Sequence, residues 1–340
     1  MKNLSFLNKI LFFVNNIFAL LFLASFALPY IPPRSFPLLS IMSLLFPLLI
    51  MVHLVFMLYW ILIGLKKQLL LSFLCLAAAV GFSFFPYKFN AKTVVSGNSF
   101  SVMNYNVRIF NKYEWIENDH IPEEISSFIK EQDPDLLALQ EYYPAKGFQV
   151  NYPYKYEKLD GHKTVLGLGL FSKFQIVNQG SLDFEQSNNN AIFIDVLKND
   201  DTIRIYNIHL ESFGIKPDSV DLNLDETRSK RLIYRLKRSF SKQQAQVEKF
   251  MMHKEKCRHK VIISGDFNNT AYSWAYHKLK DDLRDTFLAS GKGFGETYSF
   301  NKYPLRIDFI LSDKKFKVNQ HRNFDIRLSD HEPIMARMSY

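Results

Sequence analysis

The sequence predicts an α/β protein in two parts: an apolar, helical membrane anchor over residues 1–92, and an α/β domain over residues 97–340. Two observations lead to this division. Residues 1–96 contain no Asp or Glu, whereas all 33 acidic residues of the chain follow them. After residue 96, short β-type runs alternate with amphipathic helical patterns, which is typical of an α/β domain.

The N-terminal part holds three apolar runs, at about residues 10–31, 37–65 and 69–86. Each is long enough for a helix that crosses a membrane, which needs about 17 to 25 residues. Pro37 and Pro47 allow the second run to begin with a short interfacial piece. A cleaved signal peptide fits poorly, because its one apolar region is not followed by two more. We expect three transmembrane helices, with two helices and a re-entrant segment as the alternative.

The basic residues near these runs predict the orientation of the protein in the membrane. Lys2 and Lys9 precede the first run, Lys66 and Lys67 separate the second from the third, and only Arg34 separates the first from the second. Because cytoplasmic segments are rich in Lys and Arg, the N-terminus should be cytoplasmic. Three crossings then place the α/β domain outside. We expect a multi-pass protein of a bacterial inner membrane, with this domain in the periplasm.

The net charge of +9 does not by itself indicate nucleic-acid binding. Seven of the 42 basic residues flank or interrupt the apolar runs, so the part after residue 96 carries only about +2. A charge this small gives no general attraction for a polyanion.

The α/β domain is predicted from eight segments. Strands are expected at 99–110, 135–141, 167–180, 191–212 (a hairpin that turns at 199–201), 260–266 and 306–311, and helices at 122–134 and about 225–256. Polar side chains recur at or just after the strand ends: Asn106, Glu141, His209, Asp266, Asn268, Asp308, Asp330 and His331. Strand ends present such groups on one rim of a rigid scaffold, where a site can form.

Seven motifs carry a family resemblance. They are YNVR, LQE, GLGLFSK, NIHLES, SGDFNN, RIDFIL and SDHEPI, in this order. Residues 97–340 resemble the endonuclease/exonuclease/phosphatase superfamily, which includes pancreatic deoxyribonuclease and the neutral sphingomyelinases. The resemblance implies a four-layer α/β sandwich of two packed mixed sheets with helices outside. It also implies a hydrolase of phosphate esters.

The resemblance implies a metal site as well. Glu141 would be the main ligand of Mg²⁺, or of Mn²⁺, with Asn106 and Asp330 close by. Such hard cations prefer oxygen ligands. The alternatives are that Glu141 is a surface carboxylate and that Asn106 is a turn residue.

Catalytic roles follow from the same motifs. His331 would act as the base, because its ordinary pKa lies near neutrality, with Asp308 as its partner. Asp266 would orient or deprotonate the attacking water, and Asn268 would donate to a phosphate oxygen. Since alternate residues of an extended chain point the same way, both could face one phosphate. Phe267 between them would anchor the strand end, although Asp and Asn after a strand are also ordinary turn residues.

His209 is expected to bind phosphate or act as a general acid, and the sequence assigns it no acidic partner. A lone His in such a strand is otherwise more often a buried structural residue. Relatives of the deoxyribonuclease, sphingomyelinase and deadenylase type carry a His at this place. Abasic-site repair nucleases do not, and they have an Asp where this chain has Arg108, so the chain looks unlike a repair nuclease.

The segment 226–260 holds twelve basic residues against three Glu, with apolar residues at helical spacing. It reads as a core-packing helix with a solvated basic face, or as a contact for anionic lipid head groups or a polyanionic substrate.

The function predicted from these features is that of a membrane-anchored, Mg²⁺-dependent phosphodiesterase. Its substrate would be a nucleic acid or a phospholipid head group, and the loops 211–226 and 290–300 give no readable code for the choice. Alternatives are a phosphomonoesterase for a small substrate, and a catalytically silent binding module. A channel is disfavoured, because His53 is the one ionisable residue within the apolar runs.

Overall fold

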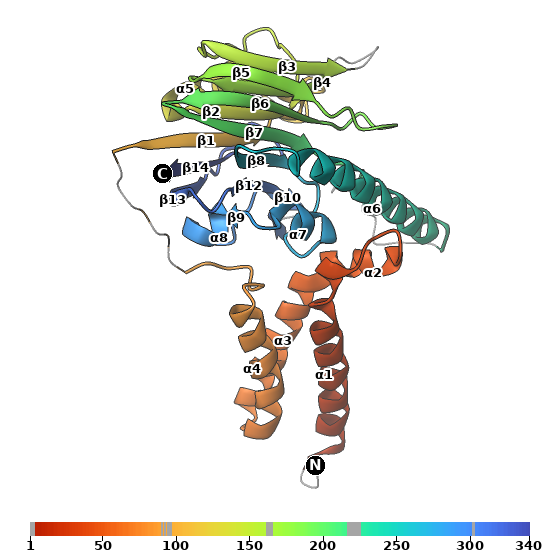
Figure 1. Ribbon diagram of the computed structural model, residues 1–340. Helices are drawn as coiled ribbons and strands as arrows, with labels where there is room; N and C mark the ends of the chain where they lie inside the picture. Colours follow the sequence, from red (N-terminus) through yellow and green to blue (C-terminus); the bar gives the residue numbers. More distant parts are fainter. Residues whose placement is uncertain are drawn as a thin grey trace.

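The structure, a computed structural model, describes residues 4–89, 91, 93, 97–160, 166–215, 226–300 and 303–340. Lys2, Asp225 and most of the predicted substrate loop 211–226 lie outside these residues. Figure 1 shows two parts, a group of N-terminal helices and an α/β domain in which two sheets lie face to face.

The domain contains two six-stranded sheets. The first consists of β1 (Ser99–Asn106), β2 (Leu136–Tyr142), β3 (Tyr154–Asp160), β4 (Leu166–Ser172), β13 (Lys317–Asn323) and β14 (Ile334–Ser339), in the order β13-β14-β1-β2-β4-β3. The second consists of β5 (Gln175–Ser181), β6 (Ala191–Lys198), β7 (Asp201–His209), β8 (Lys260–Asp266), β9 (Arg284–Asp285) and β12 (Asp308–Ser312), in the order β5-β6-β7-β8-β12-β9. Each sheet has one parallel pair, β1–β2 or β7–β8, and is therefore mixed.

Helices cover the outer faces of both sheets and complete a four-layer sandwich, as predicted. Helix α5 (Ile121–Gln132) packs on the first sheet, and α6 (Glu226–Lys254) and α7 (Trp274–Lys280) pack on the second. A short helix, α8 (Thr286–Ser290), lies beside β12 and β13. The small hairpin of β10 (Tyr298–Phe300) and β11 (Tyr303–Leu305) stands apart from both sheets. The inter-sheet core is built from alternate apolar residues of facing strands, which explains the period-two pattern of the sequence.

The predicted elements are found with one main correction. The hairpin turn at Asn199 is confirmed, and this residue adopts the left-handed conformation that such turns need. The single strand expected over 167–180 is wrong, because β4 and β5 belong to different sheets. The chain turns between them, where the Ser172 hydroxyl exchanges hydrogen bonds with the backbone of Phe174. Edge strands β3 and β13 were not predicted, since their residues are mostly polar.

The N-terminal part differs from the prediction in its third helix. Among the described residues, two helical segments, Phe6–Tyr30 and Pro37–Leu62, are long and apolar enough to cross a membrane, not three. They comprise α1 (Phe6–Ser25) with η1 (Leu28–Tyr30), and α2 (Pro37–Met42), η2 (Ser43–Leu45) and α3 (Phe46–Leu62). The short first piece, α2, was expected from the two prolines. The third run forms α4 (Lys66–Gly81), whose 16 residues span only about 24 Å. A hydrocarbon core is about 30 Å thick.

A buried polar cluster joins these helices. The Asn15 amide of α1 donates to the Ser72 hydroxyl of α4 at 3.0 Å, and Trp60 Nε1 of α3 donates to Asn15 Oδ1 at 3.1 Å. His53 Nδ1 lies 3.2 Å from the Ser72 hydroxyl. His53 is thus an interhelical hydrogen-bonding partner, and α4 packs as a member of the same group despite its length.

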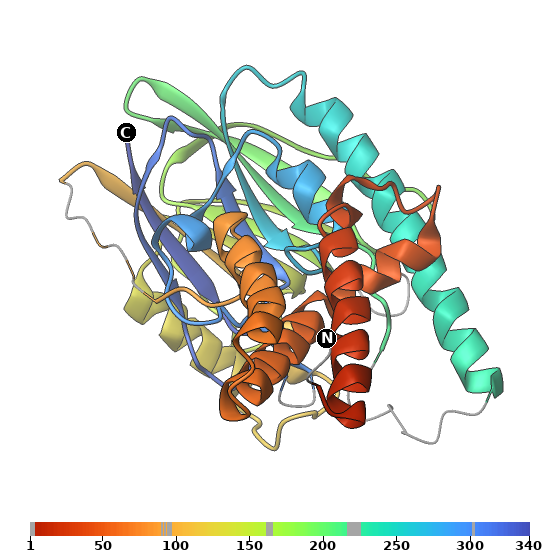
Figure 2. The same ribbon diagram turned by 90° about the horizontal axis from the view of Figure 1, so that it is seen from below.

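The helical part is docked onto the helical layer of the second sheet (Figures 1 and 2). Phe46, at the start of α3, stacks on Tyr272 with ring centroids 4.4 Å apart, and Tyr30 meets His277 of α7 at the same distance. Arg34 pairs with Glu248 of α6 at 3.2 Å. Ring stacking and ion pairing therefore fix the orientation of the domain on its helices.

Gly265, the residue before Asp266, is a position that tolerates no side chain. A Cβ there would fall on the backbone carbonyl oxygen of Ile208 in the neighbouring strand, which cannot move away. We expect Gly265→Ala to lower the free energy of unfolding by roughly 1–3 kcal/mol, the usual cost of overpacking. Denaturant titration would measure this. Gly97→Ala is the matched control, because its Cβ would meet nothing; equal effects would contradict the prediction.

Candidate active site

The register of three neighbouring strands brings three predicted site residues into one row. Asp266, at the end of β8, lies opposite His209 of β7 on one side and Asp308 of β12 on the other. All three side chains point toward the other sheet, since they share the parity of inter-sheet core residues such as Ile262 and Ile310. Asn106 approaches from the end of β1 in the first sheet.

A layer of buried amides lies between this row and the apolar core. Gln140 Nε2 donates to Asn104 Oδ1 at 2.9 Å and to Asn207 Oδ1 at 2.6 Å, and Asn104 Nδ2 donates to Asp308 Oδ1 at 3.2 Å. These residues are not among those predicted from the sequence. Their signal was present, because Asn104 and Asn207 precede Asn106 and His209 by two positions and so share their faces. The layer holds Asp308 in place without adding a charge.

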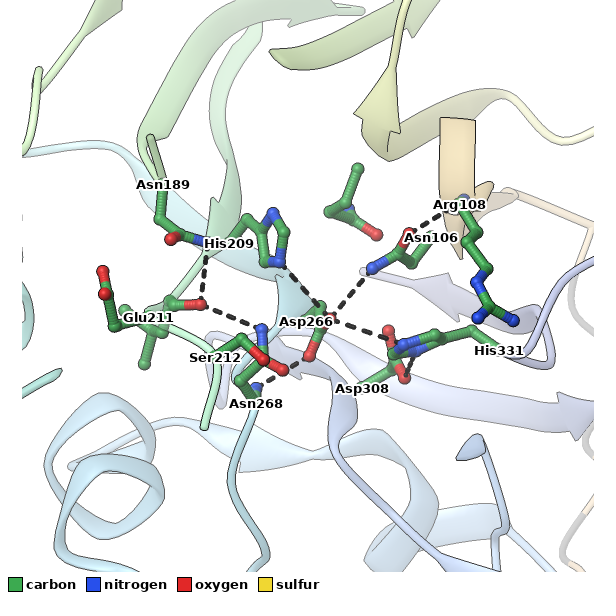
Figure 3. Close-up of polar contacts among 12 residues, drawn as sticks. Asn106, Arg108, Asn189, His209, Glu211, Ser212, Asp266, Asn268, Asp308 and His331 are labelled. Atoms are coloured by element: carbon green, nitrogen blue, oxygen red, sulfur yellow. Dashed lines mark hydrogen bonds and ion pairs between the residues drawn. The ribbon is translucent and has the colours of Figure 1, made fainter. Parts of the chain in front are cut away.

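Asp266 is the centre of the site (Figure 3). It is 1% exposed, and its Oδ2 accepts a hydrogen bond from Asn106 Nδ2 at 3.0 Å. The same oxygen lies 3.6 Å from His209 Nε2 and 3.7 Å from His331 Nε2. Burial raises the pKa of Asp266 to about 7, and the nearby charge of Asp308 adds to the shift. A carboxyl group poised in this range can take up and release a proton.

His331 lies between two carboxylates. Its Nδ1 is 2.9 Å from Asp308 Oδ2, as the predicted pairing requires, and its ring packs 5.0 Å from that of Tyr298. Burial alone would lower the pKa of His331, but Asp308 and Asp266 outweigh burial and raise it to about 10. Both ring nitrogens face carboxylates, so the imidazolium form is favoured.

The pKa of His209 is shifted in the opposite direction to that of His331. Burial lowers its pKa to about 3, and the charge of His331 acts in the same direction. Its nearest acid is Asp266, whereas Glu211, two residues on, is bound by Lys242 at 2.7 Å. His209 is therefore a neutral imidazole, able to donate one N–H.

Asn268 does not lie as predicted. The chain leaves the extended conformation there, with φ at +48°, so Asp266 and Asn268 do not alternate along a strand. The Asn268 backbone N–H donates to Asp266 Oδ1 at 2.7 Å, and its side-chain amide donates to the Leu210 carbonyl at 2.9 Å. The turn fixes the Asp266 carboxylate. The intervening Phe267 is fully buried in the outer core, as expected.

Glu141 sits at an irregular point of β2. Its backbone is left-handed, with φ at +47°, within the bulge between Leu139 and Tyr142. Burial raises the pKa of Glu141; the charge of His331 opposes this shift and that of Asp330 adds to it. Backbone strain of this kind persists where the surroundings impose it, often at functional sites. The bulge turns the carboxylate toward the group formed by Asn106 and Asp330.

A left-handed turn follows Asn106 and carries Arg108. Residues 108–111 all have positive φ, which costs about 1–2 kcal/mol for each non-glycine residue. Buried Phe110 and the hydrogen bonds of Asn111 to Ile116 hold this turn in place. It sets the Arg108 guanidinium 4.0 Å from the ring centre of Trp115 and 3.3 Å from Asp330 Oδ2.

The rim of the two sheets thus gathers acids, amides and two histidines in distinct protonation states. The family model described as "Endonuclease/Exonuclease/phosphatase family" matches residues 103–331, about two thirds of the chain. The chain belongs to the endonuclease/exonuclease/phosphatase family. Its members are metal-dependent phosphoester hydrolases. A second model, described as a domain of unknown function (DUF8431), matches residues 8–85.

Solved structures of similar fold are found at low identity. A humanized D. rerio TDP2 is 17% identical, with 71% of this chain and 99% of that chain covered and a TM-score of 0.54. A family protein from Bacteroides thetaiotaomicron is 16% identical, with 72% and 98% covered and a TM-score of 0.51. D. rerio TDP2 complexed with single strand DNA product is 18% identical, with 71% and 99% covered and a TM-score of 0.50. These likenesses establish the fold alone. No curated protein sequence matches the chain.

The donor atoms at the site fit the divalent metal that the family uses. Within the described residues, Asp266, Asp308 and His331 offer one ligand atom each, all within 4.8 Å of one another. This group differs from the predicted set of Asn106, Glu141 and Asp330. In the group of Asp266, Asp308 and His331, the imidazole already contacts the Asp308 carboxylate. Glu141 and Asp330 instead bring two negative charges close together. The carboxylate and amide oxygens of Glu141, Asp330 and Asn106 are the kind of ligand that a hard cation prefers.

The basic helix α6 packs on the second sheet through Val247 and Phe250, so its core-packing interpretation is confirmed. Several of its bases are used within the protein: Arg235 donates to the Gly214 carbonyl, and Lys242 pairs with Glu211. Contact of 226–260 with an anionic surface stays a prediction.

Proposed function

We propose that the protein is a membrane-anchored, Mg²⁺-dependent phosphodiesterase. The observation that carries this proposal is the group around Asp266, which is buried, lies close to two histidines and accepts a hydrogen bond from Asn106 of the first sheet. No described Arg or Lys pairs with Asp266. Because a buried carboxylate without such a partner costs stability, a catalytic reason for it is favoured.

The arrangement supports a division of roles. Glu141 and Asp330, with the Asn106 amide oxygen, would hold Mg²⁺, which when bound would polarise the phosphate and offset its charge. Asp266 would accept the proton of the attacking water. The base role was predicted from the sequence for His331. However, the two carboxylates beside its ring nitrogens keep His331 protonated, which suits it to stabilising the charge that develops on phosphate.

His209 would complete the phosphate site as a neutral N–H donor, on the opposite side of Asp266 from His331. Asn268 would act differently from its predicted role as a phosphate donor. With its amide bound to Leu210, it would position Asp266 through its backbone N–H.

A nucleic acid is the substrate class that we favour. The supporting observation is the similar structure of D. rerio TDP2, which is complexed with single strand DNA product. A phospholipid head group is the second candidate, favoured by the domain's direct docking on apolar helices. The segments Phe6–Tyr30 and Pro37–Leu62 would form the membrane anchor, and α4 would return to the domain beside α3.

Purified full-length protein should cleave a phosphodiester only with a divalent metal. We expect EDTA to abolish cleavage and Mg²⁺ to restore it, with plasmid DNA, single-stranded DNA, RNA, an aryl phosphodiester and phospholipids tested side by side. Glu141→Gln should raise the Mg²⁺ concentration needed for half-maximal rate by about tenfold or more, since metal sites lose about this much even when only a group that supports a ligand is changed.

Glu157→Gln is the matched control for this experiment, because Glu157 lies on β3 and binds the Tyr142 hydroxyl instead of the site. Cleavage that persists in EDTA would contradict the proposal. Cleavage of a phosphomonoester alone would favour the phosphomonoesterase, and folded protein inactive on every substrate would favour the binding module.

A further inference from the structure

A cavity of about 790 Å³ lies where the N-terminal helices meet the domain. Its volume falls within the range of about 300–1,000 Å³ that is usual for small-molecule sites. One wall is the first half of α3, with Ile50, Met51 and Leu54, and the facing wall comes from the domain, with Tyr276 and Phe287. The cavity is separate from the site around Asp266.

The cavity opens among exposed apolar side chains. Met51 and Leu54 are 50% and 39% exposed, and Phe82, Phe89 and Phe294, which also line it, are each more than half exposed. Exposed apolar groups of this density are rare on a surface that faces water. Because Leu54 lies two helical turns into α3 from the domain, the opening would reach below the level at which a bilayer's hydrocarbon begins.

Polar groups lie at a few points of the lining only. The Thr270 hydroxyl is buried, with 4% of the residue exposed, and has no hydrogen-bonding partner in the described part of the chain. A buried hydroxyl without a partner costs free energy, which a ligand acceptor would offset once the Thr270 side chain turned toward the cavity. Lys280 and His277 also line the cavity, and Lys280 makes no ion pair with any described residue.

We propose that this cavity binds one acyl chain of a bilayer phospholipid, with an ester carbonyl near Thr270 and the phosphate near Lys280. The inference rests on the membrane anchoring proposed above. An acyl chain matches the apolar walls, and the surrounding bilayer supplies it at very high local concentration. The lining segments Thr270–Tyr272 and Tyr303–Arg306 flank Asp266 and Asp308 in the sequence, so a bound lipid would brace both strand ends.

Photo-crosslinking tests the proposal without an activity assay. Full-length protein is placed in phosphatidylcholine nanodiscs that contain phosphatidylglycerol with a diazirine on one acyl chain. After illumination, tryptic peptides are analysed by mass spectrometry. We expect label on the peptide Val261–Lys278, which carries Thr270 and His277 and belongs to the domain, not to the apolar helices.

A cavity-filling variant gives the decisive comparison. Leu54→Trp should lower the label on this peptide by about tenfold, one decade of affinity. Leu58→Trp is the matched control, because Leu58 is one turn further along α3, is 57% exposed and does not line the cavity. Equal labelling of the peptide in the two variants would overturn the acyl-chain site.

Further outcomes separate the site from the anchor. Label on α1 and α3 with none on Val261–Lys278 would overturn the acyl-chain site and leave membrane anchoring intact. No label anywhere would overturn both. Should Leu54→Trp fail to fold, Thr270→Val keeps the side-chain shape and removes only the donor. It should reduce the phosphatidylglycerol retained in native mass spectra, and undiminished retention would count against the proposal.

Discussion

Asp266→Asn is expected to reduce phosphodiesterase kcat/KM by about 10³-fold, near the middle of the range for loss of a general acid or base. Asparagine has almost the same shape, so Asn106, His209 and His331 keep their neighbour. What the change removes is the negative charge and the proton acceptor at the centre of the site. Steady-state kinetics on the best substrate, at saturating Mg²⁺, would measure the loss.

Asp285→Asn is the matched control for Asp266→Asn, because Asp285 is similarly buried, at 2% exposed, and lies in the same sheet but on the edge strand β9, outside the candidate site. It should keep its rate per folded molecule. A folded Asp266→Asn protein with a rate near that of the wild type would refute the role of Asp266. A loss of rate in both variants would indicate that impaired folding, not loss of the Asp266 carboxylate, lowers the rate.

Arg306→Met is expected to lower the free energy of unfolding of the domain by about 3–5 kcal/mol. This is the usual cost of removing one member of a buried ion pair and leaving the other charge unpaired. Arg306 Nη1 lies 2.7 Å from Asp285 Oδ2, which also accepts a hydrogen bond from the Tyr276 hydroxyl at 2.5 Å. The guanidinium packs 4.7 Å from the ring centres of Phe287 and Phe309. Denaturant titration of residues 93–340 would measure the change.

The effect should depend on pH with a definite sign. Burial by itself would raise the pKa of Asp285, but Arg306 and Tyr276 hold it below its ordinary value. The ion pair therefore stabilises the fold above the unfolded pKa of about 3.9, and this contribution is lost as the pH falls through the folded value. The difference between wild type and Arg306→Met should be largest near neutrality and shrink below about pH 4.

A double variant checks the cause. Asp285→Asn with Arg306→Met removes both charges and should regain part of the stability lost by Arg306→Met alone. Arg322→Met is a surface control, since Arg322 stacks on Phe324 but is exposed and has no acidic partner among the described residues. Its cost should stay within about 0.5 kcal/mol. A double variant less stable than Arg306→Met would contradict the prediction.

For the candidate site, the sequence predicted one contact correctly but not the geometry around Asn268. Asp308 and His331 were paired correctly because both stand in motifs whose order along the chain marks the family. The orientation of Asn268 was missed, since a single left-handed residue after a strand redirects its side chain and leaves no trace in an alternating pattern. The amide layer of Asn104, Gln140 and Asn207 was missed because its contacts cross between sheets, and pairing at long range is not encoded in local periodicity.

The helical part shows the same limit. Hydropathy located the apolar runs, but it could not tell that the third would form only 16 residues of helix or that a buried cluster around Asn15 and Ser72 would bind it to the others. Nor does any sequence pattern indicate that Phe46 stacks on Tyr272 of the domain. Such contacts depend on the docked arrangement of two parts far apart in the chain.

The stacking of Phe46 on Tyr272 has a consequence for how substrate is found. Tyr272 lies only six residues after Asp266. The Asp266 carboxyl group is therefore connected to the helices by one short stretch of ordered chain, not by a flexible linker. A catalytic domain joined to its anchor by a flexible linker can reach substrates over a wide range of positions and orientations. A domain fixed in this way holds its active site at one height and one tilt relative to the helices. Substrates would therefore be selected first by whether their phosphate can reach that height, and only then by contacts within the site.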